Sequence, residues 1–169
     1  MKSSIPFPAV KALCLAAVSI LLSSCDPGFD EDMVILNQSQ HSVTVVPSPY
    51  CYYSQERDST FVHEKETFDI APGDSVTVSR DGGTGSASRD NAIYHFQHYY
   101  NDSVTFRFDD GLQVTYHSDD TTGISPYNFA SGNYSYSEKL NEKGLYFKNH
   151  PYYGKMTFTL TEAHHAEAE

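Results

Sequence analysis

SVTFRFDDGLQVTYH, residues 103–117, is the stretch of this sequence that decides the fold class. Apolar and polar residues alternate on both sides of a central Asp-Asp-Gly, which is the period of a strand with one buried face. Directly opposite residues of an antiparallel pair point to the same face of a sheet. One register puts six apolar side chains on one face by pairing Phe108 with Leu112, Phe106 with Val114 and Val104 with Tyr116. The stretch therefore predicts a β-hairpin.

That register leaves Asp109-Asp110-Gly111 as a three-residue loop. Such loops commonly combine a type I turn with a left-handed residue, a conformation that Gly111 adopts at little steric cost. A two-residue turn would set Phe108 against Gln113 and mix the two faces. The two aspartates are interpreted as turn residues, in preference to calcium ligands.

The same alternation recurs along the chain, around residues 42–46, 75–79 and 156–161. Shorter strands are expected at 34–36, 67–70 and 145–148. Ala71-Pro72-Gly73-Asp74 has Pro and Gly where a type II turn needs them, and joins the strand at 67–70 to the next. Because the polar residues that alternate with the apolar ones are mostly Ser and Thr, each strand has one buried and one solvent-exposed face, as in antiparallel sheets. We predict one all-β domain, residues 34–162, folded as an antiparallel two-sheet sandwich, with a small β-barrel as the alternative.

Three further segments have distinct patterns. Apolar residues recur at helical spacing in Asp90–Tyr100, with Ser88 or Asp90 as a cap, although the segment also fits an aromatic strand. At most one short helix is therefore expected. Residues 81–86 (DGGTGS) are expected to form a flexible loop, and residues 163–169 a polar tail.

The amino terminus has the three parts of an export signal. Lys2 gives a positive start, residues 12–22 are apolar, and Ser23-Ser24 supply small residues before Cys25. The apolar run is too short to cross a bilayer, which takes about 20 residues. Leu22-Ser23-Ser24-Cys25 resembles the lipobox of bacterial lipoproteins. The resemblance implies removal of residues 1–24, a diacylglycerol on the Cys25 thiol, and further acylation such as palmitate. Two acyl chains anchor a protein firmly without spanning the membrane.

An acidic cluster follows Cys25, with Asp26 and then Asp30-Glu31-Asp32. In enterobacterial lipoproteins an Asp directly after the Cys implies inner-membrane retention, whereas an acidic cluster in Bacteroidota lipoproteins resembles a surface-display signal. We favour the second interpretation, which places the protein in the cell envelope, at the outer membrane and exposed on the cell surface. Residues 25–33 are expected to be a solvated tether.

Removing residues 1–24 takes away two of the 11 basic residues and none of the 22 acidic ones, leaving a formal charge of −13. Such a surface opposes binding to nucleic acid. Cys51 is the one cysteine left besides Cys14 in the leader and Cys25, and is interpreted as a small buried residue.

No motif for catalysis or for a cofactor is present in the sequence, so we expect a protein that is not an enzyme. His95 and His98 could share a helix face, but a zinc site needs three or four ligands, and we assign no metal site. His164-His165 lies in the expected tail, where it could bind metal weakly.

The stretch from Tyr127 to Tyr136 indicates a ligand-binding role. Exposed tyrosines beside amides suit stacking on sugar rings. The candidate ligand-binding residues are Tyr127, Asn128, Asn133, Tyr134 and Tyr136, with further tyrosines at 50, 52, 53, 152 and 153. Packing of these tyrosines in the core is the favoured alternative, because strands recruit Tyr for packing alone.

The mature region also resembles small uncharacterised β-sandwich lipoproteins of Bacteroidota. The residues that carry this resemblance are Ile35-Leu36-Asn37, Ile70–Ser75, Phe108–Gly111 and Phe158–Glu162. It implies the fold and the surface location but no site residues. The expected function is a non-catalytic binding or structural role in the envelope. Partners are the membrane, through the lipid, and either an envelope protein or a glycan. A glycan-binding accessory module and, after it, a hydrolase are the alternatives.

Overall fold

The computed structural model describes residues 28–55, 57–84, 87–140 and 152–169. The leader, Cys25 and the strand expected at 145–148 lie outside the described residues. None of the described helices is long and apolar enough to cross a membrane.

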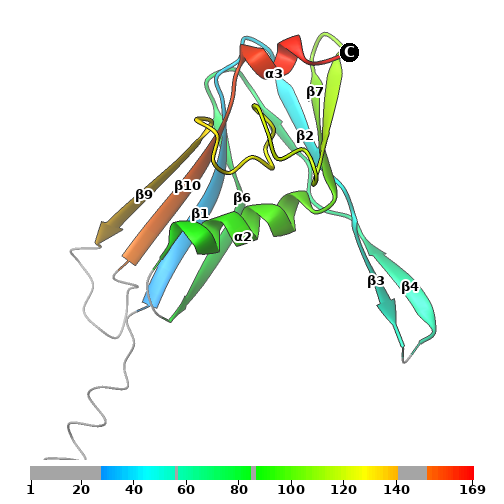
Figure 1. Cartoon of the computed structure of the whole chain (residues 1–169), viewed down its shortest axis with the longest axis vertical. Helices are drawn as coiled ribbons and strands as arrows, with labels where there is room; N and C mark the ends of the chain where they lie inside the picture. The colour runs from blue at the N-terminus through cyan, green and yellow to red at the C-terminus, as the bar shows by residue number, and fades with distance from the viewer. Residues whose placement is uncertain (1–27, 56, 85–86, 141–151) are drawn as a thin grey trace, which may run out of the picture.

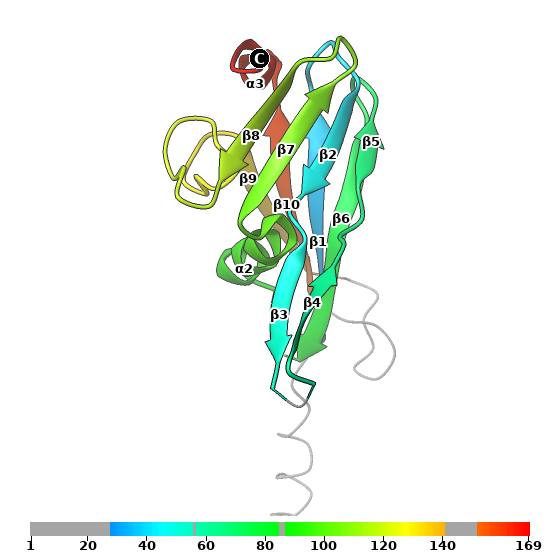
Figure 2. The same cartoon turned by 90° about the vertical axis from the view of Figure 1, so that its right-hand side faces the viewer.

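Two four-stranded sheets pack together, which confirms the predicted sandwich (Figures 1 and 2). The first sheet has the order β6-β1-β10-β9, with β6 at Ser75–Thr84, β1 at Gly28–Asn37, β10 at Tyr152–Leu160 and β9 at Tyr134–Leu140. The second has the order β5-β2-β7-β8, with β5 at Phe68–Ile70, β2 at Val43–Pro47, β7 at Ser103–Phe108 and β8 at Gln113–His117. A separate hairpin, β3 at Tyr50–Ser54 with β4 at Ser59–His63, projects from the body as an arm.

The hairpin of β7 and β8 has the predicted register. Phe106 lies opposite Val114 and Val104 opposite Tyr116. The Phe108 amide donates to the Leu112 carbonyl at 2.8 Å, and Gly111 has a φ of 91°. The alternation of the sequence and its turn glycine thus predict this hairpin correctly.

The turn at Ala71–Asp74 also forms as predicted, with Gly73 at a φ of 81° and the Asp74 amide donating to the Ala71 carbonyl at 3.0 Å. Its flanking strands, β5 and β6, belong to different sheets. The turn therefore carries the chain from one sheet to the other instead of closing a hairpin.

The first and last strands of the domain, β1 and β10, are neighbours and run parallel, with Met33 opposite Met156 and Ile35 opposite Phe158. Parallel neighbours require a long connection. Here the connection is almost the whole domain, so the two ends of the fold are held together at the centre of the first sheet.

Helix α2, Arg89–Tyr100, confirms the helical interpretation of that segment. Ser88 is the N-cap, and its hydroxyl accepts from the Asn91 amide at 3.2 Å. Because Ala92, Phe96, Tyr99 and Tyr100 are buried, the helix covers the part of the first sheet that the second sheet leaves open (Figure 1).

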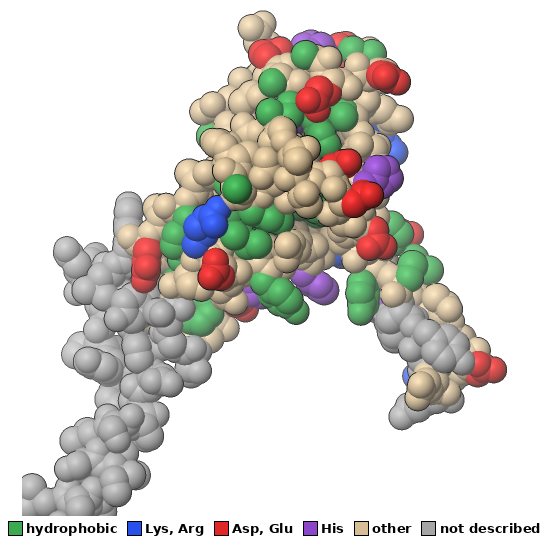
Figure 3. Space-filling view, in the orientation of Figure 1, with side chains coloured by type: hydrophobic (Ala, Val, Ile, Leu, Met, Phe, Trp, Pro, Cys, Tyr) green, Lys and Arg blue, Asp and Glu red, His purple; other side chains and the backbone are tan. Residues whose placement is uncertain are grey.

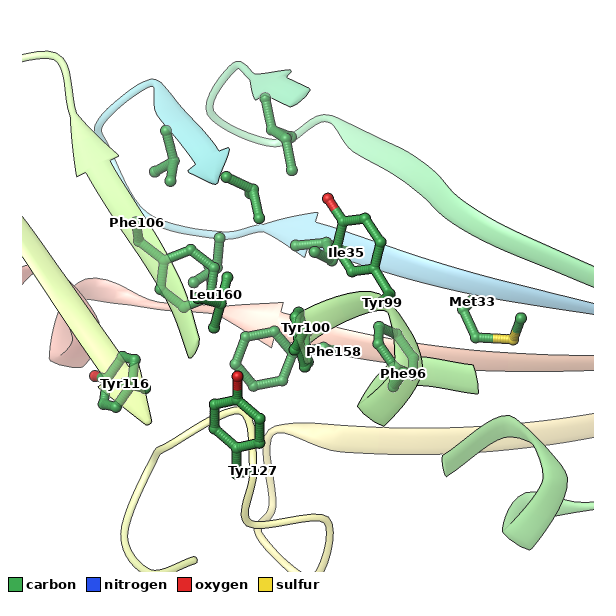
Figure 4. Close-up of a cluster of buried hydrophobic side chains, with 14 of the residues drawn as sticks. Met33, Ile35, Phe96, Tyr99, Tyr100, Phe106, Tyr116, Tyr127, Phe158 and Leu160 are labelled. Carbon is green, nitrogen blue, oxygen red and sulfur yellow. The ribbon is translucent and has the colours of Figure 1, made fainter. Parts of the chain in front are cut away.

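The core lies between the two sheets and α2. Side chains from every layer meet in it (Figure 4), among them Met33, Ile35, Phe96, Tyr100, Phe106, Phe158 and Leu160, all fully buried. The Phe106 and Phe158 rings stack across the sheets with centroids 6.1 Å apart. Burying one such ring stabilises the fold by about 1.5–3 kcal/mol.

Several segments differ from expectation. The predicted tether is part of β1 from Gly28 onward, and Glu31 in it is fully buried. Residues 81–84 of the predicted loop continue β6. Cys51, expected to be buried, is exposed on the arm. The first two errors share a cause, because the pairing of β1 with β6 and β10 overrode the local polar composition.

The predicted polar tail is also ordered. A second helix, α3 at Glu162–Ala166, occupies it, and only one helix was expected. Beyond α3, the Glu169 amide and carbonyl pair with the carbonyl and amide of Gln113 at 3.0 and 3.1 Å. The carboxyl-terminal segment is therefore fixed to the edge of β8.

Candidate functional site

Four polar side chains meet at the end of the sandwich where α3 lies. We call His41, Asp109, Asp110 and His165 the His–Asp cluster. His41 comes from the β1–β2 loop, the two aspartates from the β7–β8 turn, and His165 from α3. Figure 3 shows histidine and acidic side chains together at this end of the molecule.

Each histidine of the cluster contacts one aspartate. His41 Nδ1 lies 3.0 Å from Asp109 Oδ1, and His165 Nε2 lies 2.7 Å from Asp110 Oδ2. The two imidazole rings stack on each other, with centroids 3.9 Å apart and 14° between their planes. The Phe108 ring meets the His165 ring edge-on at 4.9 Å. The two His–Asp pairs therefore form one compact group.

Hydrogen bonds from backbone amides and from the two histidines lower the pKa of both carboxylates. The Ser42 amide donates to Asp109 Oδ2, and the Leu112 amide donates to Asp110 Oδ1, both at 3.1 Å. The Ser42 amide and then His41 lower the pKa of Asp109, and His165 and then the Leu112 amide lower that of Asp110. At neutral pH the turn thus presents two negative charges beside two imidazoles.

The position of His41 depends on Asn37, the last residue of β1 and fully buried. Its Nδ2 donates to the carbonyls of His41 and Ile70, at 2.8 and 2.9 Å. Its Oδ1 accepts from the Ser39 amide at 3.0 Å and the Ser39 hydroxyl at 2.7 Å. Because all of its amide groups are used within the fold, Asn37 fixes the loop that carries His41.

The position of His165 depends on its neighbour His164, which is fully buried. His164 Nδ1 accepts from the Thr161 amide, and its Nε2 donates to the Ile124 carbonyl, both at 3.1 Å. Burial lowers the pKa of His164. Since His164 points inward, the next residue of the helix is turned outward to the cluster.

The composition of the cluster suits a metal ion. Ligand atoms of His41, Asp110 and His165 all lie within 4.8 Å of one another. No metal site is predicted from the sequence, where Asp110 is interpreted as a turn residue, His165 as a tail residue, and His41 has no assigned role. The one usable signal there is the weak metal affinity expected of His164-His165, since the other two ligands are distant in sequence.

A second polar group, which we call the Glu31 joint, lies between β1 and α2. The buried Glu31 carboxylate accepts from the Ser88 amide at 2.9 Å, from Asn91 Nδ2 at 2.9 Å and from the Tyr136 hydroxyl at 3.0 Å. A Cβ on Gly154 would lie 2.8 Å from Glu31 and from the Tyr136 hydroxyl, so that position requires glycine. The carboxylate sits at the amino terminus of α2, where negative charge is favoured. The joint fastens the helix to the first sheet.

The candidate ligand-binding residues pack within the protein. Tyr127 is buried, Tyr134 and Tyr136 are half-buried, and each hydroxyl is bonded inside the fold, to the Asn101 carbonyl, the Pro126 carbonyl and Glu31 respectively. Burial is also the main reason why the pKa of each tyrosine is raised. This arrangement matches the packing alternative.

The two asparagines of that candidate set have local roles. The Nδ2 of Asn128 donates to the Gly123 carbonyl at 2.8 Å, and that of Asn133 to the Ile124 carbonyl at 3.3 Å. Both bonds close the long connection between β8 and β9. The five candidate residues therefore share a region without forming a common face.

His95 and His98 do not converge on one point. His95 Nε2 pairs with Asp81 Oδ2 at 2.8 Å, whereas the His98 ring lies beside that of Tyr50, with centroids 5.9 Å apart. Although both histidines lie on α2, His95 contacts Asp81 and His98 contacts Tyr50.

Comparison with protein-family models, curated protein sequences and solved structures finds no match to this chain. Function is therefore argued from the residues and their geometry.

Proposed function

We propose that the chain is a lipid-anchored protein of the bacterial cell envelope with a non-catalytic binding or structural role, displayed from the outer membrane at the cell surface. The observation that carries the proposal is Leu22-Ser23-Ser24-Cys25 at the end of an apolar run. Its support is the order of features, since a positive start, an apolar run and small residues lead directly to the cysteine.

The start of the fold agrees with an anchor at this position. Only Asp26 and Pro27 separate Cys25 from β1, which begins at Gly28. Three Cα–Cα steps span about 11 Å at most. A lipid on Cys25 would therefore hold the first residues of β1 close to the bilayer surface, with the acidic residues of β1 nearby.

The far end of the sandwich is then the end available to partners. β1 contains ten residues and is about 34 Å long. The start of β1 and helix α3 lie at opposite ends of the molecule (Figures 1 and 2). The His–Asp cluster would face away from the membrane, which favours a binding role at that end.

The glycan alternative receives less support. Stacking on sugars needs exposed ring faces, and the hydroxyls of Tyr127, Tyr134 and Tyr136 are bonded within the fold, whereas Tyr50 on the arm is exposed. We therefore carry forward the general binding or structural role without a glycan ligand.

The experiment is membrane fractionation of cells that express the full chain, Cys25→Ser and Cys51→Ser. Cys51 is a matched control, because it is also a cysteine but lies exposed on the arm. The wild type and Cys51→Ser are expected in the outer-membrane fraction, and Cys25→Ser is expected to be lost from the membrane. Membrane association that survives Cys25→Ser would refute the anchor. Digestion by an added protease on intact cells then tests surface display.

A further inference from the structure

The His–Asp cluster has a chemistry that the proposed anchoring role does not use. We propose that His41, His165 and Asp110 form a binding site for a divalent transition metal, with Zn²⁺ as the ion, at the α3 end of the sandwich. The inference does not depend on the anchor, because every ligand lies within the described body.

The ligand set selects the class of ion. Two imidazoles and one carboxylate are ligands that suit Zn²⁺ and related transition metals, whereas Ca²⁺ and Mg²⁺ prefer oxygen ligands alone. Three protein ligands leave coordination positions for water or a further group. The Asp109 carboxylate, which contacts His41 Nδ1 at 3.0 Å, is the group next to the site that can orient His41.

The distances are close to what a metal requires. Ligand atoms about 2.0–2.2 Å from a tetrahedral Zn²⁺ lie about 3.4 Å from one another. Those of the cluster lie within 4.8 Å of one another. Binding therefore needs side-chain rotations that turn the two stacked rings, whose centroids lie 3.9 Å apart, toward one ion.

The backbone under each ligand is already fixed. Asn37 holds the His41 loop through the His41 carbonyl, and the buried His164 holds the helix that carries His165. The β7–β8 turn is closed by the bond from the Gly111 amide to the Phe108 carbonyl, at 3.0 Å. Three segments distant in sequence thus converge in a preorganised way, which lowers the cost of binding.

Charge favours a cation at the same place. The carboxylates of Asp109 and Asp110 each contact an imidazole, at 3.0 and 2.7 Å. Coordination of Asp110 and His165 to a metal replaces the hydrogen bond between them, while Asp109 keeps its contact with His41.

The test is titration of the purified full-length protein in detergent with Zn²⁺, followed by isothermal calorimetry. Single variants His41→Gln, His165→Gln and Asp110→Asn are compared with the control His117→Gln, an exposed histidine outside the cluster. The thiols are the same in all of these proteins and contribute equally. The wild type and the control are expected to bind one Zn²⁺ per chain, and each cluster variant is expected to lose at least tenfold in affinity.

A second measurement separates binding from folding. Saturating Zn²⁺ is expected to raise the unfolding temperature of the wild type and of His117→Gln, because a ligand that binds only the folded state stabilises it. His165→Gln, unfolded in parallel, is expected to show no such rise. Equal Zn²⁺ affinity in the cluster variants and the wild type, or no saturable binding by the wild type at about 1 mM Zn²⁺, would overturn the proposal.

Discussion

Replacing Glu31 with alanine tests the Glu31 joint most strongly, because this carboxylate is fully buried and accepts three hydrogen bonds. Each hydrogen bond to a charged group contributes about 1.5–3 kcal/mol, so the three together contribute about 4.5–9 kcal/mol. Because the variant no longer buries a charge, the desolvation cost of several kcal/mol is removed, which offsets part of this loss. We expect the free energy of unfolding to fall by about 3 kcal/mol.

The variant Glu31→Gln removes the charge but keeps two of the three hydrogen bonds. Its amide oxygen can still accept from the Ser88 amide and the Tyr136 hydroxyl, but its NH₂ group faces the donor Asn91 Nδ2. We expect a smaller loss of about 1–2 kcal/mol, since one polar contact becomes unfavourable.

The assay is urea unfolding followed by far-ultraviolet circular dichroism, because the chain has no tryptophan to report by fluorescence. Glu64→Ala is the control, as Glu64 is an exposed glutamate between β4 and β5, and a change within about 0.5 kcal/mol is expected. A loss below about 1 kcal/mol for Glu31→Ala would refute the role assigned to the joint.

Three further predictions concern the fold around the His–Asp cluster. Burial holds the pKa of His164 below its ordinary value of 6.5, so as the pH falls the unfolded chain takes up a proton at this histidine before the folded chain does. The contribution of His164 to stability is therefore complete above pH 6.5 and declines below it. Between pH 7.5 and 5.5 the wild type should therefore lose more free energy of unfolding than His164→Gln, and equal losses would contradict this. Asn37→Ala leaves the carbonyls of His41 and Ile70 without their donor and should cost about 3 kcal/mol in urea unfolding. The exposed Gln38→Ala should cost little. In Gly111→Ala the added Cβ meets no described atom within 4 Å, so the only cost is the φ of 91°. Thermal unfolding should show a loss of about 1–2 kcal/mol in the free energy of unfolding, and an unchanged stability would contradict this.

The parts of the fold that the sequence predicts are those set by local chemistry. In the β7–β8 hairpin, alternation chooses the buried face and Gly111 supplies the left-handed residue that closes the loop. In α2, the Ser88 cap and the helical spacing of Ala92 and Phe96 agree with each other. In both elements, the residues that predict the structure lie within about 15 residues of one another. The prediction therefore needs nothing from the rest of the chain.

The parts that could not be predicted depend on distant partners. Asp30-Glu31-Asp32 has the composition of a solvated segment, and only the pairing of β1 with β6 and β10 buries Glu31. The His–Asp cluster is of the same kind, because its members lie in a loop, a turn and a tail that are far apart in sequence. Nothing near His41 in the sequence indicates that His165 will stack on it.

The lipid anchor proposed at Cys25 can be observed by mass spectrometry of the amino-terminal peptide from protein purified from membranes. We expect a peptide that begins at Cys25 and carries the mass of a diacylglycerol and further acyl groups. An unmodified peptide that begins at Met1, or one cut elsewhere with a free Cys25 thiol, would contradict it.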